Sequence, residues 1–274
     1  MNKTVREIFC SRRVKTAAVA LPLIVLLLAF APKWLFFILL LVVLALLGHE
    51  GWPLFFGERG GFLLHGPVWF FSFLLFLAAY LGGVAALSGA LTIAVFALVL
   101  LLFEAGLEAE ALPRFALAVL FILYLPFFFA HLLLIWDLPD GRSLVALVFM
   151  VTWGGDAFSY YCGTYWGKRK LSPTISPNKT VEGFLAGLFG GAFFALILTW
   201  FGFISIAWNE AVVLGLAANF LGQMGDLFES YLKRSCGIKD SGGLIPGHGG
   251  FLDRVDSVLF AAPVVFYAYI LWIL

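Results

Sequence analysis

The chain has 274 residues, of which 63% are hydrophobic and only 12% are charged, and its formal net charge is +1. Soluble domains carry about twice this charged fraction, so one soluble core could not bury so many apolar residues without leaving large apolar patches exposed. The composition therefore excludes an ordinary soluble domain and predicts an all-α integral membrane protein, with no nucleic-acid partner expected.

Apolar windows long enough to cross the hydrocarbon as helices predict a polytopic bundle of about nine transmembrane helices. The windows lie near residues 16–31, 33–48, 66–82, 84–103, 114–135, 143–166, 181–203, 210–232 and 256–274. Only Ala31-Pro32-Lys33 separates the first two windows, which predicts a tight helical hairpin. The basic N-terminus leads into these spans without a clear cleavage site, so we do not expect a cleaved signal peptide.

The basic residues predict the orientation of the bundle. If the N-terminus is cytoplasmic, the Lys and Arg residues of the chain fall on the cytoplasmic side, apart from Lys33 and Arg142. Cytoplasmic loops carry such an excess of positive charge. We therefore expect a protein of the cell membrane whose most polar loops face the cytoplasm. One continuous membrane domain is expected, with residues 1–142 as a helical scaffold and residues 143–274 carrying the chemistry.

The densest polar segment of the chain lies between the last two predicted spans, at residues 233–257. Its glycines allow backbone N–H groups to approach phosphate oxygens closely, and its basic side chains can neutralise them. This combination indicates a polyphosphate site at a membrane surface. The candidate substrate-binding residues of the segment are Lys233, Arg234, Lys239, Asp240, Gly247, His248, Gly249, Gly250 and Arg254.

Three carboxylates flank this segment and indicate a divalent cation. Asp226 falls on one helical face with Asn219, Gln223 and Ser230, and burying a carboxylate in a membrane costs about 2.5–3.5 kcal/mol, which favours a functional role. Asp253 and Asp256 are three residues apart and share a helical face. Hard carboxylate oxygens beside phosphates suit Mg²⁺. The alternatives are a polar helix–helix seam for Asn219 and Gln223, and an ordinary helix cap for Asp253.

A second motif, Ser176-Pro177-Asn178-Lys179-Thr180-Val181-Glu182-Gly183-Phe184, precedes the span at 181–203. Thr180 is predicted to cap that helix, and a helix N-terminus is itself an anion site. The further substrate-binding candidates from this motif are Ser176, Asn178, Lys179 and Glu182. An ordinary capped, basic loop is the alternative interpretation.

Two more acidic residues are weaker candidates. Asp156 offers a polar group to the interior of the span at 143–166. Glu50, at the end of the second span, is interpreted as an interfacial anchor.

Together the two motifs resemble the phosphatidate cytidylyltransferases, also called CDP-diacylglycerol synthases. The resemblance covers the chain from about Trp153 to Ser257. It rests on the Ser176–Phe184 motif, on Pro246-Gly247-His248-Gly249-Gly250 and on Asp253-Arg254-Val255-Asp256-Ser257. The chain departs from the family pattern at Asn178, where a lysine is usual, and at Val181, where an aromatic residue is usual. Lys179 is therefore the better phosphate contact.

The resemblance implies that CTP and phosphatidic acid react to give CDP-diacylglycerol and pyrophosphate. It implies catalytic roles for Asp226, Asp253, Asp256 and Lys239, with the three aspartates as Mg²⁺ ligands and a second cation allowed nearby. His248 is expected to contact phosphate rather than to act as a base, because a phosphate monoester is already ionised at pH 7.

Two other functions stay open at this point. A CTP-dependent polyprenol kinase would use similar groups but attack the γ-phosphorus, and an ion-coupled transporter could use Asp156, Asn219, Gln223 and Asp226 as an ion path. A CDP-alcohol phosphotransferase is disfavoured, because Asp140-Gly141 lacks the further aspartates of that hallmark.

Small residues also allow a homodimer, because they permit close helix packing. They are Gly82, Gly83, Gly187, Gly190 and Gly191, which serve contacts within one chain equally well.

Overall fold

The computed structural model describes residues 25–57, 62–106, 108–242 and 250–273. Seven helical segments in this part of the chain are long and apolar enough to cross a membrane. The protein is therefore an all-α polytopic membrane protein, as predicted from composition, although the count of about nine spans stays a prediction. The first predicted span, 16–31, lies mostly outside the described residues.

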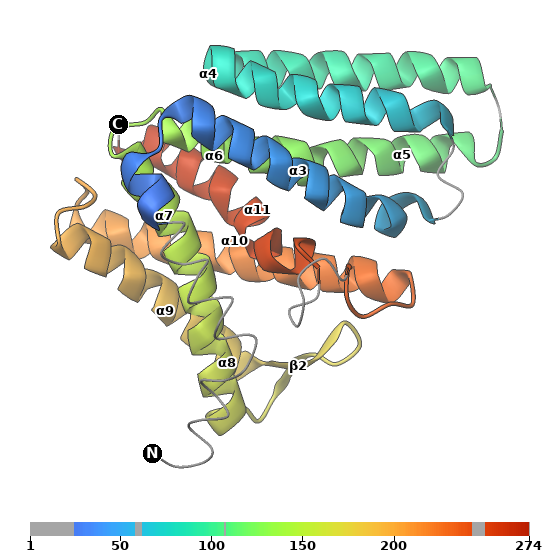
Figure 1. Cartoon of the computed structure of the whole chain (residues 1–274). Helices are drawn as coiled ribbons and strands as arrows, with labels where there is room; N and C mark the ends of the chain where they lie inside the picture. Colours follow the sequence, from blue (N-terminus) through green and yellow to red (C-terminus); the bar gives the residue numbers. More distant parts are fainter. Residues whose placement is uncertain (1–24, 58–61, 107, 243–249, 274) are drawn as a thin grey trace.

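The helices follow the predicted windows closely (Figure 1). Their bounds are α3 (Lys33–Phe56), α4 (Phe62–Ala105), α5 (Ala111–Ile122), α6 (Phe128–Trp136), α7 (Gly141–Phe149), α8 (Gly155–Trp166), α9 (Val181–Trp200), α10 (Trp208–Ser235) and α11 (Leu252–Ala268). Three wider, π-helical turns extend them: η2 (Leu123–Phe127), η3 (Met150–Gly154) and η4 (Tyr269–Ile273). Through η2 and η3, α5 continues into α6 and α7 continues into α8 as single spans.

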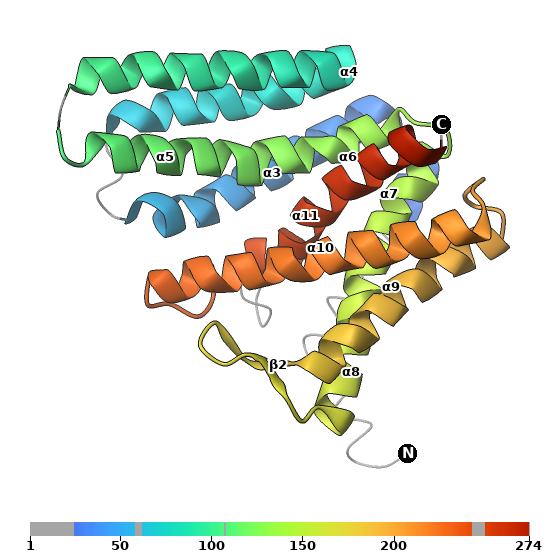
Figure 2. The same ribbon diagram turned by 180° about the vertical axis from the view of Figure 1, so that it is seen from behind.

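Helix α4 contains a sharp reversal. Gly83 has φ 64° and ψ −154°, a conformation that an L side chain disfavours, and the helix bends back there. Its two halves lie side by side in both ribbon views (Figures 1 and 2). The predicted spans 66–82 and 84–103 are these two halves, separated at the predicted residue.

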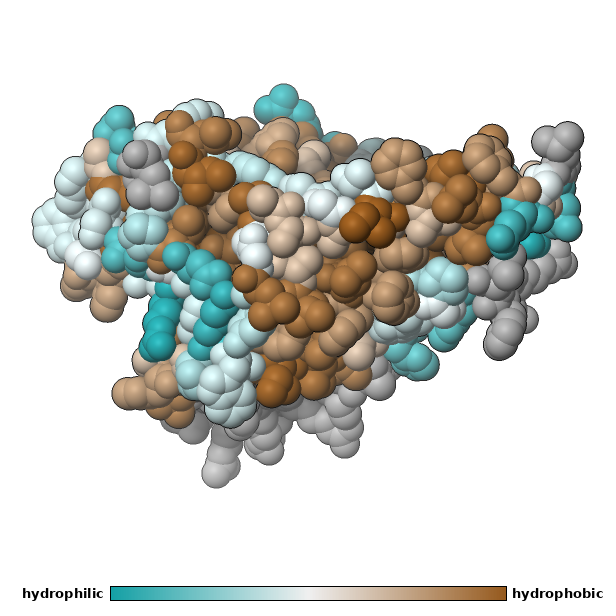
Figure 3. Space-filling view, turned by 90° about the horizontal axis from the view of Figure 1, so that it is seen from above, coloured by the Kyte–Doolittle hydropathy of each residue, from teal (hydrophilic) through white to brown (hydrophobic). Residues whose placement is uncertain are grey.

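The outer surface is suited to lipid. Large apolar side chains such as Phe70, Phe96 and Phe103 are exposed on α4. Apolar residues also cover much of the face shown in Figure 3, with hydrophilic residues gathered toward its margins. In water such a surface would be an aggregation site, whereas in a bilayer it faces acyl chains of similar polarity.

Glycines allow α8, α9 and α10 to pack closely. A Cβ on Gly215 of α10 would lie 2.6 Å from the backbone oxygen of Gly191 of α9, and a Cβ on Gly191 would lie 2.7 Å from the oxygen of Gly215. A Cβ on Gly190 would meet the ring of Phe158 of α8 at 2.9 Å. These glycines serve contacts within the chain, and the homodimer stays a prediction.

A short hairpin interrupts the helices between α8 and α9. Strands β1 (Lys170–Ser172) and β2 (Ser176–Thr180) are antiparallel, with Lys170 opposite Thr180 and Ser172 opposite Ser176. The sequence predicts only a loop here. The hairpin lies beside the C-terminal half of α10 and places the second motif there (Figure 2).

Candidate functional site

The two motifs meet where the hairpin, the C-terminal part of α10 and the first turns of α11 come together. Lys179 of β2 and Asp226 of α10 form an ion pair, with Nζ 2.7 Å from Oδ2. The other oxygen of Asp226 faces the hydroxyl of Ser230 at 3.5 Å. Both members of the ion pair are partly exposed, so the pair lies at an accessible edge of the bundle rather than in its core.

About two turns beyond Asp226 along α10, a buried lysine is held between two acids. The ammonium group of Lys233 donates to Glu229 Oε2 at 2.5 Å and also to Asp253 Oδ1 of α11. The side chain of Glu229 is almost fully buried, and that of Asp253 is mostly buried. A charge at such a depth is tolerated when it is paired. Lys233 therefore joins α10 to α11, and its predicted contact with phosphate stays a prediction.

Asp253 also joins the two ends of the glycine-rich segment. Its Oδ2 accepts from the backbone N–H of Gly250 at 2.8 Å and from the hydroxyl of Ser241 at 3.0 Å. The Ser241 backbone N–H donates to the same oxygen at 3.3 Å. Both oxygens of Asp253 thus accept hydrogen bonds from protein groups. The carboxylate joins Ser241, which follows α10, to Gly250, which precedes α11.

Asp256 lies one turn deeper in α11 and is buried. Its Oδ1 accepts from the backbone N–H of Ser257 at 2.7 Å. The carboxylate is close enough to Asp226, Glu229 and Asp156 to interact with their charges. Asp156, at the start of α8, in turn interacts with the charges of Asp226, Lys179 and Arg254. The structure therefore adds Asp156 to the carboxylates that the sequence placed in the site.

Asn219 and Gln223, which precede Asp226 on α10, form a polar helix–helix seam, as the alternative interpretation of these two residues predicted. The amide of Asn219 donates to the backbone oxygen of Val151 at 2.8 Å. Gln223 donates to Asn219 Oδ1 at 2.7 Å and to the oxygen of Phe184 at 3.1 Å. With their donors directed at other helices, these side chains bind α10 to η3 and α9.

Several residues predicted to bind substrate hold the hairpin in place. Thr180 caps α9 as predicted, accepting from the N–H of Gly183 at 3.1 Å. Glu182 accepts from the backbone N–H groups of Lys168 at 3.0 Å and Arg169 at 3.2 Å. Arg234 reaches the oxygen of Ile175 at 3.4 Å. Glu182 and Arg234 thus position the strand that carries Lys179.

The remaining predicted residues are at the margin of this cluster or outside it. Lys239, Asp240 and Asn178 are exposed, and Ser176 is half-buried in β2. Arg254 is exposed, while its backbone oxygen accepts from the indole N–H of Trp153 at 3.1 Å. Gly247, His248 and Gly249 lie outside the described residues, so their predicted roles stay predictions.

A family model for the cytidylyltransferase family matches residues 11–272, nearly the whole chain. The chain belongs to this family.

Curated relatives agree with this assignment. A phosphatidate cytidylyltransferase of Staphylococcus aureus (strain COL) is 43% identical over 128 residues, which cover 46% of this chain and 48% of the relative. One from Bacillus subtilis (strain 168) is 42% identical over 127 residues, covering 46% of this chain and 47% of the relative. The match thus spans about half the length of each relative.

The carboxylates of the site meet some of the requirements for binding a divalent cation. In the described part of the chain, no group of three or more His, Cys, Asp or Glu side chains could hold a metal ion. Mg²⁺, however, takes one or two protein carboxylates and completes its shell with water and substrate phosphates. Asp226 and Asp256, whose charges interact, are the candidates for these one or two ligands, whereas Asp253 is already bound to Lys233, Ser241 and Gly250.

Three residues near the site were not identified correctly from the sequence: Glu50, Tyr124 and Glu229. Glu50 was interpreted as an interfacial anchor, which is wrong: it is buried and accepts from the N–H of Leu252 at 2.9 Å. Tyr124 is buried beside the cluster, and its hydroxyl has no partner among the described residues. Glu229, which binds Lys233, was not predicted as part of the site. Only a contact between distant segments could reveal Glu50 and Tyr124.

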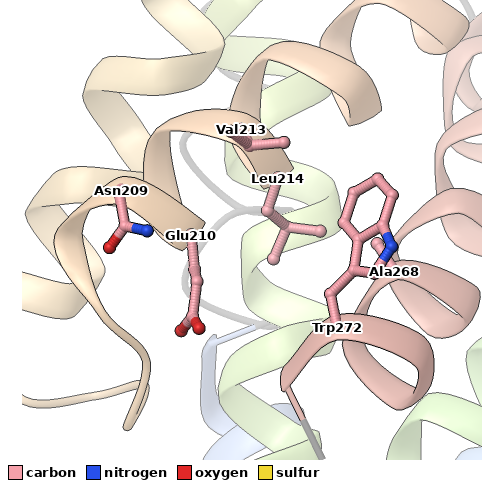
Figure 4. Close-up of a pocket in the computed structure, with 6 residues that line it drawn as sticks. All are labelled: Asn209, Glu210, Val213, Leu214, Ala268 and Trp272. Atoms are coloured by element: carbon pink, nitrogen blue, oxygen red, sulfur yellow. The ribbon is translucent and has the colours of Figure 1, made fainter.

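A small pocket of the fold lies away from the site. About 120 Å³ in volume, it lies between the start of α10 and the end of α11 (Figure 4). It is lined by Asn209, Glu210, Val213, Leu214, Ala268 and Trp272. Seventeen residues of helix, or about 25 Å, separate Asn209 from Asp226, so this pocket lies at the other end of α10.

Proposed function

We propose that this chain is a phosphatidate cytidylyltransferase, which transfers the cytidylyl group of CTP to phosphatidic acid and releases pyrophosphate. The observation that carries the proposal is the ion pair between Lys179 and Asp226, which brings the Ser176–Phe184 motif against the carboxylate that precedes the 233–257 segment. A cation and a carboxylate from different elements, beside a glycine-rich segment, suit a reaction between two phosphate-bearing substrates.

The chemistry needs little acid–base catalysis. An ionised phosphate oxygen of the lipid attacks the α-phosphorus of CTP, and the bond to the β-phosphate oxygen breaks as pyrophosphate leaves. Both substrates are anions, so positioning and charge neutralisation provide most of the catalysis. Lys179, Lys239 and Arg254 are the cations we assign to phosphate oxygens, with Arg254 able to bind in a bidentate manner.

We place Mg²⁺ on Asp226 and Asp256, with Asp253 holding the adjoining segment. When bound, the ion would neutralise charge on the phosphates that meet there. With a cation held by Asp226, Lys179 would be available to bind a phosphate oxygen. A second cation stays part of the proposal, with Asp156 as the further acid whose charge interacts with those of Asp226 and Asp256.

The placement of the site suits an insoluble substrate. The acyl chains of phosphatidic acid can stay in the bilayer beside the exposed apolar helices, while the headgroup reaches the polar edge at α10 and the hairpin. We further propose that the protein lies in the cell membrane with this edge facing the cytoplasm, where CTP is available. The basic residues of the loops favour that orientation.

The test is to incubate the purified protein in detergent with phosphatidic acid, Mg²⁺ and CTP labelled at the α-phosphorus. The proposal predicts that label enters the lipid fraction while unlabelled pyrophosphate is released. Accumulation of labelled CDP with no labelled lipid would instead indicate a kinase. Absence of CTP turnover would contradict both enzymatic functions.

A further inference from the structure

Glu50 reaches from the scaffold half of the chain into the site. It lies near the C-terminal end of α3, and its residue surface is only 4% exposed. Its Oε2 accepts from the backbone N–H of Leu252, the first residue of α11, at 2.9 Å. Its Oε1 has no partner within the described part of the chain. A carboxylate buried at this depth needs a reason to be there, because an apolar residue would cost less.

Two glycines explain what the carboxylate touches. A Cβ on Gly242 would lie 2.5 Å from Glu50 Oε1, and the three atoms nearest to it all belong to Glu50. A Cβ on Gly250 would lie 2.0 Å from Ser241 Oγ and 2.7 Å from Glu50 Oε2. Gly242 and Gly250 therefore both lie against the Glu50 carboxylate, and a side chain at position 242 would displace it.

Asp253 holds the same two ends from the other side. It accepts from Ser241 and from Gly250, as described above, so the two ends of the 241–250 segment lie between two carboxylates. A further contact joins α3 to the end of α10, where the thiol of Cys236 donates to the backbone oxygen of Leu54 at 3.2 Å. The scaffold thus fixes both the start and the end of the segment.

We infer that Glu50 is a positioning residue for nucleotide binding: it fixes Gly242, Gly250 and the first turn of α11, which carries Asp253 and Asp256. The assignment of the nucleotide as CTP rests on the proposed function. Glu50 acts through the backbone of these residues and touches no substrate. Its loss therefore weakens CTP binding more than it slows the chemical step, and it leaves phosphatidic acid binding unchanged.

The experiment compares five proteins: wild type, Glu50→Ala, Gly242→Ala, the double variant and, as the conservative control, Glu50→Gln. For each, the KM for CTP, the KM for phosphatidic acid and kcat are measured in detergent. Hydrogen exchange of the backbone amides from 250 to 256 is measured without substrate. Glutamine keeps the size of the side chain and one acceptor oxygen, so it is expected to restore much of the lost function.

Glu50→Ala is expected to raise the KM for CTP about tenfold or more, because it removes a charge-assisted hydrogen bond to a buried amide. It is expected to accelerate exchange of the Leu252 amide. Gly242→Ala is expected to do the same in the wild-type protein by displacing Glu50. In the Glu50→Ala background Gly242→Ala has no further effect, because the atoms that its Cβ would meet are gone.

The inference is overturned if Glu50→Ala changes neither the KM for CTP nor the exchange of Leu252, or if the two substitutions act additively. If Glu50→Ala does not fold, Gly242→Ala in the wild-type protein still tests the same contact. Exchange does not depend on turnover. If Glu50→Ala accelerates amide exchange but the wild-type protein transfers no cytidylyl group, the positioning role is supported and the proposed function is overturned.

Discussion

Lys179 and Asp226 are 47 residues apart in the sequence, yet they form the contact that defines the site. An exposed ion pair contributes only about 0–1 kcal/mol to stability, so this pair is not explained by stability alone. The chain offers a comparison in Lys33 and Asp137, which form an ion pair with the same 2.7 Å separation at the other end of α3 from Glu50. Comparing variants of the two pairs distinguishes a loss of activity that is specific to the site from the general effect of breaking an ion pair.

Lys179→Met is expected to reduce kcat/KM about a hundredfold or more, because it removes a cation aimed at developing phosphate charge. Lys179→Arg should retain part of the activity, since the charge remains but the shape of the donor changes. Initial rates of lipid labelling measure the effect. Lys170→Met, an exposed lysine of the same hairpin, is the matched control and should stay near the wild-type rate. Equal losses in both variants would count against a specific role for Lys179.

Asp226→Asn is expected to abolish turnover at every Mg²⁺ concentration, since the amide cannot replace a carboxylate as a ligand for a hard cation. The protein should stay folded in detergent, because the side chain is partly exposed and outside the core. Asp137→Asn breaks the comparison pair and should leave the rate unchanged. A Mg²⁺ titration of the rate, with thermal unfolding alongside, gives both readings. Full activity of Asp226→Asn would remove the metal assignment.

At the scale of elements, the glycine seam of α8, α9 and α10 sets the geometry of the site. The backbones come close enough for Asn219 and Gln223 to bond to neighbouring helices, which fixes the rotation of α10. That rotation decides which side of α10 presents Asp226 to the hairpin. The seam therefore fixes the orientation of α10 and, with it, the position of Asp226.

Gly215→Ala should destabilise the protein by about 1–3 kcal/mol, because its Cβ would meet backbone atoms of α9 that cannot move aside cheaply. The control is Gly89→Ala on α4, where a Cβ would meet nothing within 4 Å. Thermal unfolding in one detergent compares the two variants. A similar midpoint for both would show that the seam tolerates extra volume and does not hold α9 against α10.

At the scale of the whole molecule, the division into scaffold and chemistry holds only in part. The first half supplies the apolar helices, but Glu50 of α3 contacts the start of α11 across 202 residues of sequence. Tyr124 of η2 lies within the reach of the charges on Asp226, Glu229, Asp253 and Asp256. The scaffold helices therefore also contact the start of α11, which carries the candidate residues Asp253 and Asp256.

The sequence predicted the elements that depend on local chemistry. Long apolar windows located the spans, Gly83 was placed between two of them, and Thr180 was correctly expected to cap α9. The motifs also predicted that Lys179 and the aspartates would share one side of the protein. Each of these features is encoded within a few neighbouring residues.

Features that depend on contacts between distant segments could not be predicted in this way. The hairpin of β1 and β2 has few apolar residues and no clear alternation, so it gave no strand pattern. Glu50 and Glu229 look like ordinary helix residues until the opposing glycine or lysine is known. From the sequence, Asp253 could equally be a helix cap or a metal ligand, and only the fold shows that it accepts hydrogen bonds from Ser241 and Gly250.

The most direct test of the account compares wild type, Asp226→Asn and Asp137→Asn in one assay with phosphatidic acid, Mg²⁺ and CTP labelled at the α-phosphorus. The account predicts labelled lipid and released pyrophosphate from wild type and Asp137→Asn, and neither product from folded Asp226→Asn. Labelled lipid from Asp226→Asn at the wild-type rate would place the site elsewhere. No labelled lipid from the wild-type protein would contradict the proposed reaction itself.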